Sequence, residues 1–293
     1  MSLKHPKVSI TLIGSGNLAQ ALGPALKKAG YAIDAVVARW NPESRRRAGR
    51  LARIVGASVK KIAEFEPTSQ VVWLLHTDDA LQEAARVLAK RGTWRGRLVF
   101  HSSGALTSDV LAPLRRAGAC TASLHPMMTF VPGSAPEMAG LPFGVEGEKR
   151  AVVAATGIAR DLGGEIFEIR KANKVLYHAL GSFSSPMLVA TLVTAERVGR
   201  AAGLSPSQTR KVMRPILEQT LKNYFTNGAA AAFSGPIKRG DIETLRRHLH
   251  ELARVPEARD VYCALVRSAL LELPSARKED VLNLLTTKGT KDG

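Results

Sequence analysis

The chain has 293 residues, of which 45% are hydrophobic and 23% are charged, and its net charge is +17. This length suits two domains, or one large core with an extension, and the composition is that of an ordinary globular protein. The longest apolar stretch, residues 187–195, is too short to cross a bilayer, so we expect no membrane partner. Lys4, His5 and Lys7 stand where a targeting segment would be apolar, which predicts a cytoplasmic protein.

The cysteines and the charge exclude two further classes of site. Cys120 and Cys263 lie far apart in the sequence, without the spacing of a metal or redox motif. A basic chain is also typical of nucleic-acid partners, but here the lysines and arginines are spread along the sequence and aromatic residues make up only 5%. Because RNA-reading sheets depend on aromatic side chains, we do not expect a nucleic-acid partner.

A glycine turn near the N-terminus is the strongest motif in the sequence. A predicted strand over residues 8–13 is followed by Gly14-Ser-Gly16 and then by the apolar periodicity of a helix. Ala19 supplies the small third position of a dinucleotide fingerprint, and strand, turn and helix come in the order that this fingerprint requires. We therefore expect the pyrophosphate of a dinucleotide to be held here, by Gly14, Ser15, Gly16, Asn17 and Leu18.

The end of the second predicted strand, residues 31–38, indicates which dinucleotide is bound. NAD-binding domains place an acidic residue at this end, but Asp34 falls near the start of the strand. The strand ends at Arg39, whose guanidinium suits a 2′-phosphate. This favours NADP (NADPH) over NAD. The run Arg45–Arg47 falls on a predicted helix over residues 42–55, whose solvated face accounts for at least two of the three arginines.

Three further predicted strands end in a histidine followed by small or polar residues. They are His76 after residues 71–75, His101 after 98–100, and His125 after 120–124. One histidine in such a place is more often a packed loop residue, but three suggest a shared cleft, since ligands bind outside the carboxyl ends of parallel strands. We expect His76, Thr77 and Ser102 to line the path of the nicotinamide, and His125 to face the same cleft as a candidate catalytic residue.

The second half of the chain is helical. Two more strands are predicted over residues 142–145 and 164–169, after which the pattern is that of helices alone. The sequence therefore predicts a boundary near Arg170. It separates an α/β Rossmann-like domain, residues 1–170, from an all-α domain, residues 171–293.

The first helix of this second half carries candidate catalytic residues. Lys174 and His178 are four residues apart and share a helix face, with Tyr177 beside them. Such side chains could donate a proton to a substrate oxygen or nitrogen during hydride transfer. The alternative is an amphipathic surface, with Lys174 solvated, Tyr177 half-buried and His178 packed. Pro186, further along the same predicted helix, is expected to kink it.

Five segments, taken in order, resemble a bacterial family that joins a Rossmann-like domain to a helical domain of unknown function. They are Gly-Ser-Gly-Asn-Leu-Ala (14–19), His-Ser-Ser-Gly-Ala (101–105), Ser-Leu-His-Pro-Met (123–127), Lys-Val-Leu-Tyr-His-Ala (174–179) and Gly-Pro-Ile-Lys-Arg-Gly-Asp (235–241). That family is similar to pyrroline-5-carboxylate reductases, deazaflavin-dependent NADP reductases and β-hydroxyacid dehydrogenases. The resemblance implies NADP binding, a helical domain of the 6-phosphogluconate-dehydrogenase C-terminal type, and a homodimer formed through it.

These observations predict an NADP(H)-dependent oxidoreductase acting on a small polar imine or carbonyl substrate. Lys174 or His178 would donate the proton, and Arg239 could pair with a substrate carboxylate. Asp241, close by, is expected to be the N-cap of the next helix rather than a base. The alternative is a non-catalytic NADP-binding sensor or regulatory protein, which needs the glycine turn and Arg39 but neither Lys174 nor His178.

Overall fold

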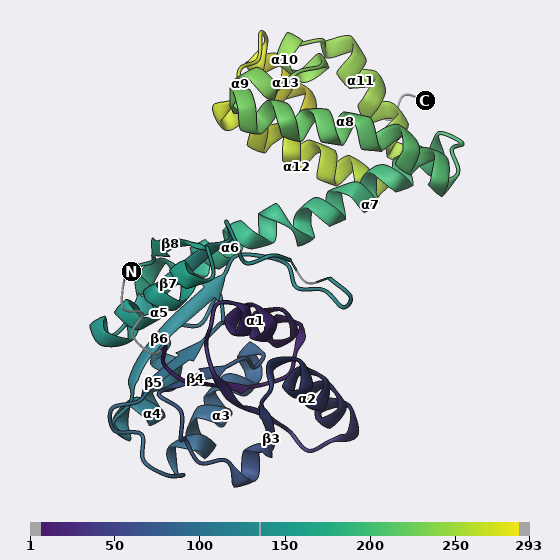
Figure 1. The fold of residues 1–293 in the computed structure, drawn as a ribbon. Coiled ribbons are helices and arrows are strands. Elements are labelled where there is room, and N and C mark those ends of the chain that lie inside the picture. Colours follow the sequence, from purple (N-terminus) through teal and green to yellow (C-terminus); the bar gives the residue numbers. More distant parts are fainter. Residues whose placement is uncertain (1–6, 135, 287–293) are drawn as a thin grey trace, which may run out of the picture. The chain divides into compact units, whose positions relative to one another are not determined.

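The computed structural model describes residues 7–134 and 136–286. The chain divides between Phe183 and Ser184 into an α/β unit and a helical unit (Figure 1). The last strand ends at Glu168, close to the predicted boundary, but the helix that follows belongs to the α/β unit by its contacts. Lys4 and His5, whose polarity argues against a targeting segment, lie outside the described residues.

The α/β unit is built on a sheet of eight strands in the order β3-β2-β1-β4-β5-β6-β7-β8 (Figure 1). Neighbouring strands are parallel except β6 and β7, which are antiparallel. The first six strands have the order of a Rossmann fold, which confirms the predicted class. The strands are β1 (Ile10–Ile13), β2 (Ile33–Ala38), β3 (Ser58–Lys61), β4 (Val71–Leu74), β5 (Leu98–His101), β6 (Cys120–Pro126), β7 (Pro142–Gly147) and β8 (Glu165–Glu168).

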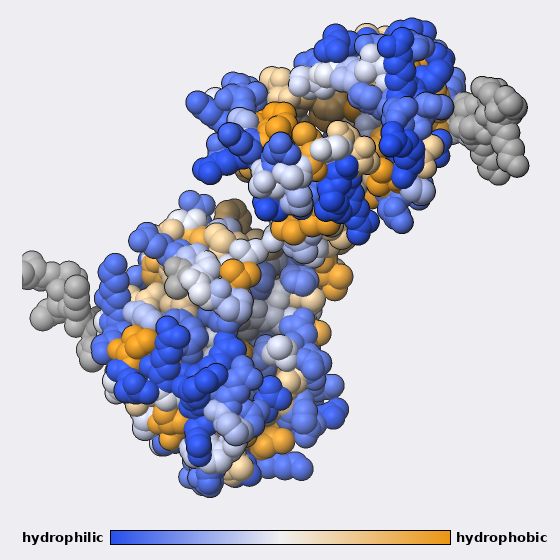
Figure 2. All heavy atoms as spheres, turned by 90° about the vertical axis from the view of Figure 1, so that its right-hand side faces the viewer, coloured by the Kyte–Doolittle hydropathy of each residue, from blue (hydrophilic) through white to orange (hydrophobic). Residues whose placement is uncertain are grey.

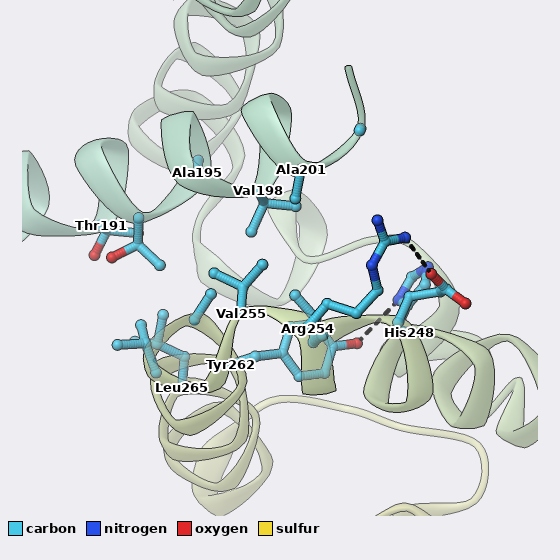
Figure 3. Close-up of a pocket in the computed structure, with 15 residues that line it drawn as sticks. Thr191, Ala195, Val198, Ala201, His248, Arg254, Val255, Tyr262 and Leu265 are labelled. Carbon is cyan, nitrogen blue, oxygen red and sulfur yellow. Dashed lines mark hydrogen bonds and ion pairs between the residues drawn. The ribbon is translucent and has the colours of Figure 1, made fainter. Parts of the chain in front are cut away.

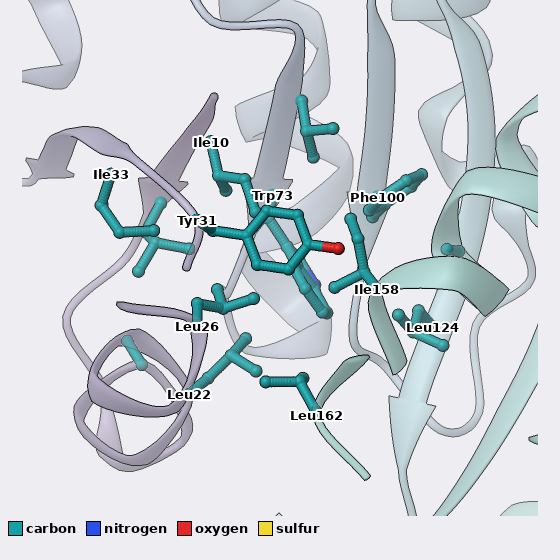
Figure 4. Close-up of a cluster of buried hydrophobic side chains, with 14 of the residues drawn as sticks. Ile10, Leu22, Leu26, Tyr31, Ile33, Trp73, Phe100, Leu124, Ile158 and Leu162 are labelled. Carbon is teal, nitrogen blue, oxygen red and sulfur yellow. The ribbon is translucent and has the colours of Figure 1, made fainter. Parts of the chain in front are cut away.

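Helices cover both faces of this sheet. Successive strand side chains point to opposite faces, so Leu12 joins the core under α1, α2 and α5 while Ile13 joins the core under α3 and α4. Figure 4 shows the first of these cores, in which Leu22 and Leu26 of α1 face Trp73 and the other buried residues of the sheet. The helices are α1 (Asn17–Lys28), α2 (Pro42–Val55), α3 (Asp78–Ala89), α4 (Ala112–Arg116), α5 (Lys149–Asp161) and α6 (Lys174–Ser184).

Strand β6 extends two residues beyond its predicted end because it gains an antiparallel partner. His125 and Pro126 pair with Gly144 and Phe143 of β7. Periodicity within one segment does not reveal this long-range pairing. As a result, His125 lies within the sheet rather than in the loop after it.

The helical unit has a core of its own, formed by α11, α12 and α13 around Leu245, Leu249 and Leu270. The predicted N-cap is confirmed, since the Asp241 carboxylate accepts a hydrogen bond from the Thr244 N–H at 3.1 Å. The predicted kink is a full break: α6 ends at Ser184, and Pro186 opens α7. The helices are α7 (Pro186–Ala201), α8 (Pro206–Asn227), α9 (Ala229–Ala232), α10 (Pro236–Arg239), α11 (Ile242–Glu251), α12 (Pro256–Glu272) and α13 (Lys278–Thr286).

Many large apolar side chains remain exposed on helices α6 to α8. Leu176 of α6 is 74% exposed and Phe225 of α8 is 81% exposed. Figure 2 shows apolar surface, in orange, among the charged residues of the helical unit. Other exposed apolar residues of these helices are Val175, Leu180, Phe183, Val189, Val193, Val212 and Ile216. Exposed apolar side chains in this number, in either unit, point to interaction sites.

Candidate functional site

The glycine turn lies where the strand order of the sheet reverses, between β1 and β4. Gly14 follows β1 and adopts a φ of +123°, a conformation that side chains disfavour. A Cβ on Gly14 would also lie 2.5 Å from the Leu75 carbonyl oxygen at the end of β4. Gly14 is therefore demanded by the fold itself.

Gly16 differs, because nothing in the fold demands a glycine there. Its φ of −68° and ψ of −176° suit any residue, and a Cβ would meet no atom within 4 Å. Gly16 is the N-cap of α1 and makes no side-chain cap, so the N–H groups of the first turn have no capping side chain. The open space and the positive end of the helix dipole together suit an anion that approaches the backbone closely.

A groove of about 280 Å³ surrounds this turn at the carboxyl ends of β1, β2 and β4. Six of the predicted cofactor-binding residues line it, namely Gly14, Ser15, Gly16, Arg39, His76 and Thr77. Asn17 lies beside it, and its amide donates a hydrogen bond to the Phe130 carbonyl oxygen at 3.0 Å. The Leu18 side chain packs on the core, which leaves its backbone N–H at the turn.

Positive charge comes from β2 and α2. Arg39 is exposed at the end of β2, whereas Asp34, near the start of that strand, accepts a hydrogen bond from Ser69 at 2.5 Å. Of the run on α2, Arg45 and Arg46 are exposed, as predicted for at least two of the three arginines. Arg47 instead lines the groove and reaches the glycine turn, which the sequence did not reveal.

His76 lines the same groove and has a buried polar atom. Burial, with a smaller effect from the charge of Arg39, lowers the pKa of His76 to about 4, so the ring is neutral at physiological pH. Its Nδ1 atom is buried and has no hydrogen-bond partner within the described residues. A buried polar atom without a partner is costly, so this atom is a candidate ligand contact.

Ser102 makes structural contacts with neighbouring strands and is not among the residues that line this groove. Its hydroxyl accepts a hydrogen bond from the Trp73 indole at 2.8 Å and donates one to the Leu124 carbonyl oxygen at 2.9 Å. These bonds connect Ser102, which directly follows β5, to β4 and β6.

Lys174 is buried at the start of α6, against the expectation of a solvated lysine in the amphipathic alternative. It is 1% exposed, and its Nζ donates to the Ser123 hydroxyl at 2.5 Å and lies 3.9 Å from a Glu146 oxygen. Glu146 is held in turn by the N–H and hydroxyl of Ser108, at 2.6 and 2.8 Å. Burial lowers the pKa of Lys174 to about 8, although the charges of Glu146 and Asp78 oppose this shift.

Two glycines make room for the ring side chains of α6. A Cβ on Gly104 would collide with the exposed His178 and would lie 2.9 Å from His125 Nε2. A Cβ on Gly144 would lie 2.6 Å from the Tyr177 hydroxyl. Tyr177 is half-buried, and its hydroxyl lies 3.3 Å from His125 Nδ1.

The structure thus brings together the three predicted catalytic residues, His125, Lys174 and His178, on β6 and the facing turns of α6. Burial, followed by the charges of Lys174 and His178, lowers the pKa of His125 to about 3, so His125 is a neutral hydrogen-bonding group at physiological pH. The sequence did not identify Glu146 as a partner of Lys174. The only signal was an acidic residue directly after the predicted strand over residues 142–145.

Comparison with known protein families follows the same division of the chain. Residues 1–126 match a Rossmann-like domain, and residues 141–269 match a domain of unknown function, DUF2520. The chain combines a Rossmann-like domain with a DUF2520 domain. The second match begins just before β7 and ends within α12, so it includes the antiparallel strand and α6 as well as most of the helical unit. No curated protein matches the chain.

Solved structures share this fold over most of their length. A protein from Bacteroides fragilis, provisionally assigned as an NADP oxidoreductase, is 24% identical, with 90% of this chain and 98% of that chain covered and a TM-score of 0.74. Protein TM1727 from Thermotoga maritima is 22% identical, with 88% and 95% covered and a TM-score of 0.70. An imine reductase from Myxococcus stipitatus in complex with NADP+ is 15% identical, with 95% and 98% covered and a TM-score of 0.65.

The DUF2520 domain also contains an apolar cavity of about 570 Å³ between α7 and α12 (Figure 3). Four of its polar side chains are paired with one another: His248 Nδ1 lies 3.2 Å from the Tyr262 hydroxyl, and Arg254 donates to Glu251 at 3.2 Å. None of the predicted site residues lines this cavity. No group of three His, Cys, Asp or Glu residues suited to a metal occurs in the part of the chain that the structure describes.

Proposed function

We propose that this chain is an NADP(H)-dependent oxidoreductase that reduces a small polar imine or carbonyl compound. The observation that carries the proposal is the groove of the Rossmann-like domain, which is lined both by Gly16, with open space beside it, and by Arg39. The imine reductase from Myxococcus stipitatus, which has the same fold and was solved with NADP+, supports this class of reaction.

The residues of the groove fit a dinucleotide phosphate. Gly16 and the uncapped first turn of α1 offer backbone N–H groups to a pyrophosphate. His76 lines the same groove, and its buried Nδ1 has no hydrogen-bond partner among the described residues. Arg39 lines the groove at the end of β2, and a guanidinium there suits a 2′-phosphate. When bound, NADPH would supply the hydride, and the chain has only to orient the substrate and deliver a proton.

The proton would come from Lys174 or His178. With its pKa at about 8, Lys174 is mostly protonated at neutral pH, and Ser123 and Glu146 fix the position of its ammonium group. His178 is exposed beside Gly104 and is therefore open to a substrate. Neutral His125 holds the Tyr177 hydroxyl and cannot itself serve as the acid.

Removal of Arg39 tests the cofactor assignment. In titrations followed by tryptophan fluorescence, Arg39→Met is expected to weaken NADPH binding by about 10- to 100-fold, the effect of losing a charge-assisted hydrogen bond. NADH binding should stay unchanged, because NADH has no 2′-phosphate. Arg46→Met, which removes an exposed arginine on α2, is the matched control and should change neither affinity.

Either of two results would contradict the proposal. If neither NADPH nor NADH binds the wild-type protein, the glycine turn has only a structural role and the oxidoreductase assignment fails. If NADPH binds but is not consumed with any imine or keto acid in a screen, the sensor alternative is favoured. If both Lys174→Met and His178→Gln lose the consumption of NADPH, the assignment of the proton donor is supported.

We also propose that the chain forms a homodimer through its exposed helices. By length and composition alone, the segment Lys171–Ala201 could cross a membrane. However, Lys174 within it is buried against Ser123 of the sheet, and the 16 residues of α7 reach only about 24 Å. Since a bilayer core is about 30 Å thick, a second copy of this chain explains the exposed apolar residues better.

Sedimentation velocity tests the homodimer. The wild-type protein is expected to sediment without detergent at twice the 31.4 kDa of one chain. Phe225→Asp should shift it to the monomer, because a charge on this 81% exposed ring would have to be desolvated in an interface. Lys211→Asp, an exposed change on the same helix, is the control. A wild-type monomer, or solubility only in detergent, would contradict the proposal.

A further inference from the structure

Of the two arginines that line the groove, Arg47 is the one whose guanidinium is hydrogen-bonded to the glycine turn. From the second turn of α2, its Nε donates to the Ser15 carbonyl oxygen at 3.1 Å, and its Nη2 donates to the Asn17 side-chain oxygen at 2.7 Å. These two residues flank Gly16, where a Cβ would meet open space. The guanidinium therefore lies at the N-terminus of α1.

The charge of Arg47 has the wrong sign for this position if stability alone is considered. Helix N-termini favour negative side chains and disfavour positive ones. The first turn of α1 carries no acidic residue, and the nearest carboxylate oxygen to Arg47, on the exposed Glu43, is 3.8 Å away. The charge of Arg47 and the positive end of the α1 dipole therefore lie side by side. A bound anion would offset the repulsion between them.

The guanidinium of Arg47 also has N–H donors that the hydrogen bonds to the turn do not use. An arginine carries five N–H donors, and the two hydrogen bonds to the turn use only two of them. The hydrogen bonds to Ser15 and Asn17 hold the guanidinium beside Gly16, while its remaining N–H groups stay available to a ligand. Arg47 is thus positioned in advance for an anion at the turn, whereas Arg39 is exposed at the end of β2.

We propose that Arg47 binds the pyrophosphate of the dinucleotide and that Arg39 binds its 2′-phosphate, so that the two arginines read different parts of one ligand. The proposal rests on the NADP(H) function proposed above. It predicts that Arg47 sets the affinity for both NADP(H) and NAD(H), while Arg39 sets the preference between them.

Binding measurements with fragments of the cofactor separate the two roles. Wild type, Arg47→Met and Arg39→Met are titrated calorimetrically with NADPH, NADH, ADP-ribose and adenosine 2′-monophosphate. Arg47→Met should weaken NADPH, NADH and ADP-ribose alike by about 10- to 100-fold, and leave adenosine 2′-monophosphate unchanged. Arg39→Met should weaken only the two ligands that carry a 2′-phosphate. Arg47→Lys should recover part of the loss, since charge remains without the fork of donors.

A control separates loss of a ligand contact from loosening of the turn. Gln20 fastens the same turn through its amide, which donates to the Ser15 and Arg47 carbonyl oxygens at 3.4 and 3.1 Å, but it is uncharged. If Gln20→Leu weakens ADP-ribose as much as Arg47→Met does, Arg47 acts on the shape of the turn and the proposal is overturned. It is also overturned if Arg47→Met spares NADH and ADP-ribose. Absence of any binding to the wild-type protein would instead count against the proposed function.

Discussion

Gly14→Ala is expected to lower the free energy of unfolding of the Rossmann-like domain by at least about 2 kcal/mol. The new Cβ would have to adopt a φ of +123° and would lie 2.5 Å from the Leu75 carbonyl oxygen. That oxygen belongs to the backbone at the end of β4, so no side-chain rotation can relieve the contact. Urea denaturation followed by tryptophan fluorescence measures the effect, because Trp40, Trp73 and Trp94 all belong to this domain.

Gly16→Ala, two residues away, is expected to leave the stability of the fold nearly unchanged and to weaken cofactor binding instead. Its backbone angles suit alanine and its Cβ would enter open space, so the free energy of unfolding should change by less than about 0.5 kcal/mol. The same Cβ would stand where a pyrophosphate approaches the backbone, so NADPH affinity should fall by at least about tenfold, or 1.4 kcal/mol. Unchanged NADPH affinity in a folded Gly16→Ala protein would refute the close-approach role of this glycine.

The contrast between these two glycines shows what the sequence could predict. The order of strand, glycine turn and helix identified the turn, and the position of Arg39 after β2 followed from the length of the strand. Both features are local, since they depend on residues that are neighbours in the chain. The fingerprint assigns Gly14 to the tight turn and Gly16 to the approach of the pyrophosphate. It could not predict the Leu75 carbonyl oxygen that makes Gly14 essential, because this oxygen lies at the end of another strand.

Residues whose role depends on packing between distant segments were not predicted. Arg47 resembles Arg45 and Arg46 in sequence, and only the packing of α2 beside α1 directs it to the turn at Ser15. In the same way, the antiparallel pairing of β7 with β6 places Gly144 opposite His125 and so makes room for Tyr177. Periodicity predicts which face of an element is apolar, but not which element lies against it.

Lys174→Met is expected to lower the free energy of unfolding by about 3 kcal/mol at neutral pH, because it leaves the buried Glu146 carboxylate without its cation. Lys174→Met/Glu146→Gln should recover most of this loss, since a glutamine can still accept the hydrogen bond from the Ser108 N–H. Chemical denaturation of the two variants measures the difference. A single variant as stable as the double variant would show that Glu146 does not depend on Lys174.

The pH dependence of stability tests the opposing effect at this site, the cost of burying the Lys174 ammonium group. Lys174 titrates at about 8 in the folded protein, below its ordinary value of 10.5. Between these two pH values the unfolded chain binds more protons than the folded one, so the contribution of Lys174 to stability rises with pH. The stability of wild type relative to Lys174→Met/Glu146→Gln should therefore increase by up to about 3 kcal/mol from pH 8 to 10.5. A relative stability that falls over this range would mean that the folded protein holds the Lys174 proton more tightly than the unfolded chain does, and that burial does not dominate at this site.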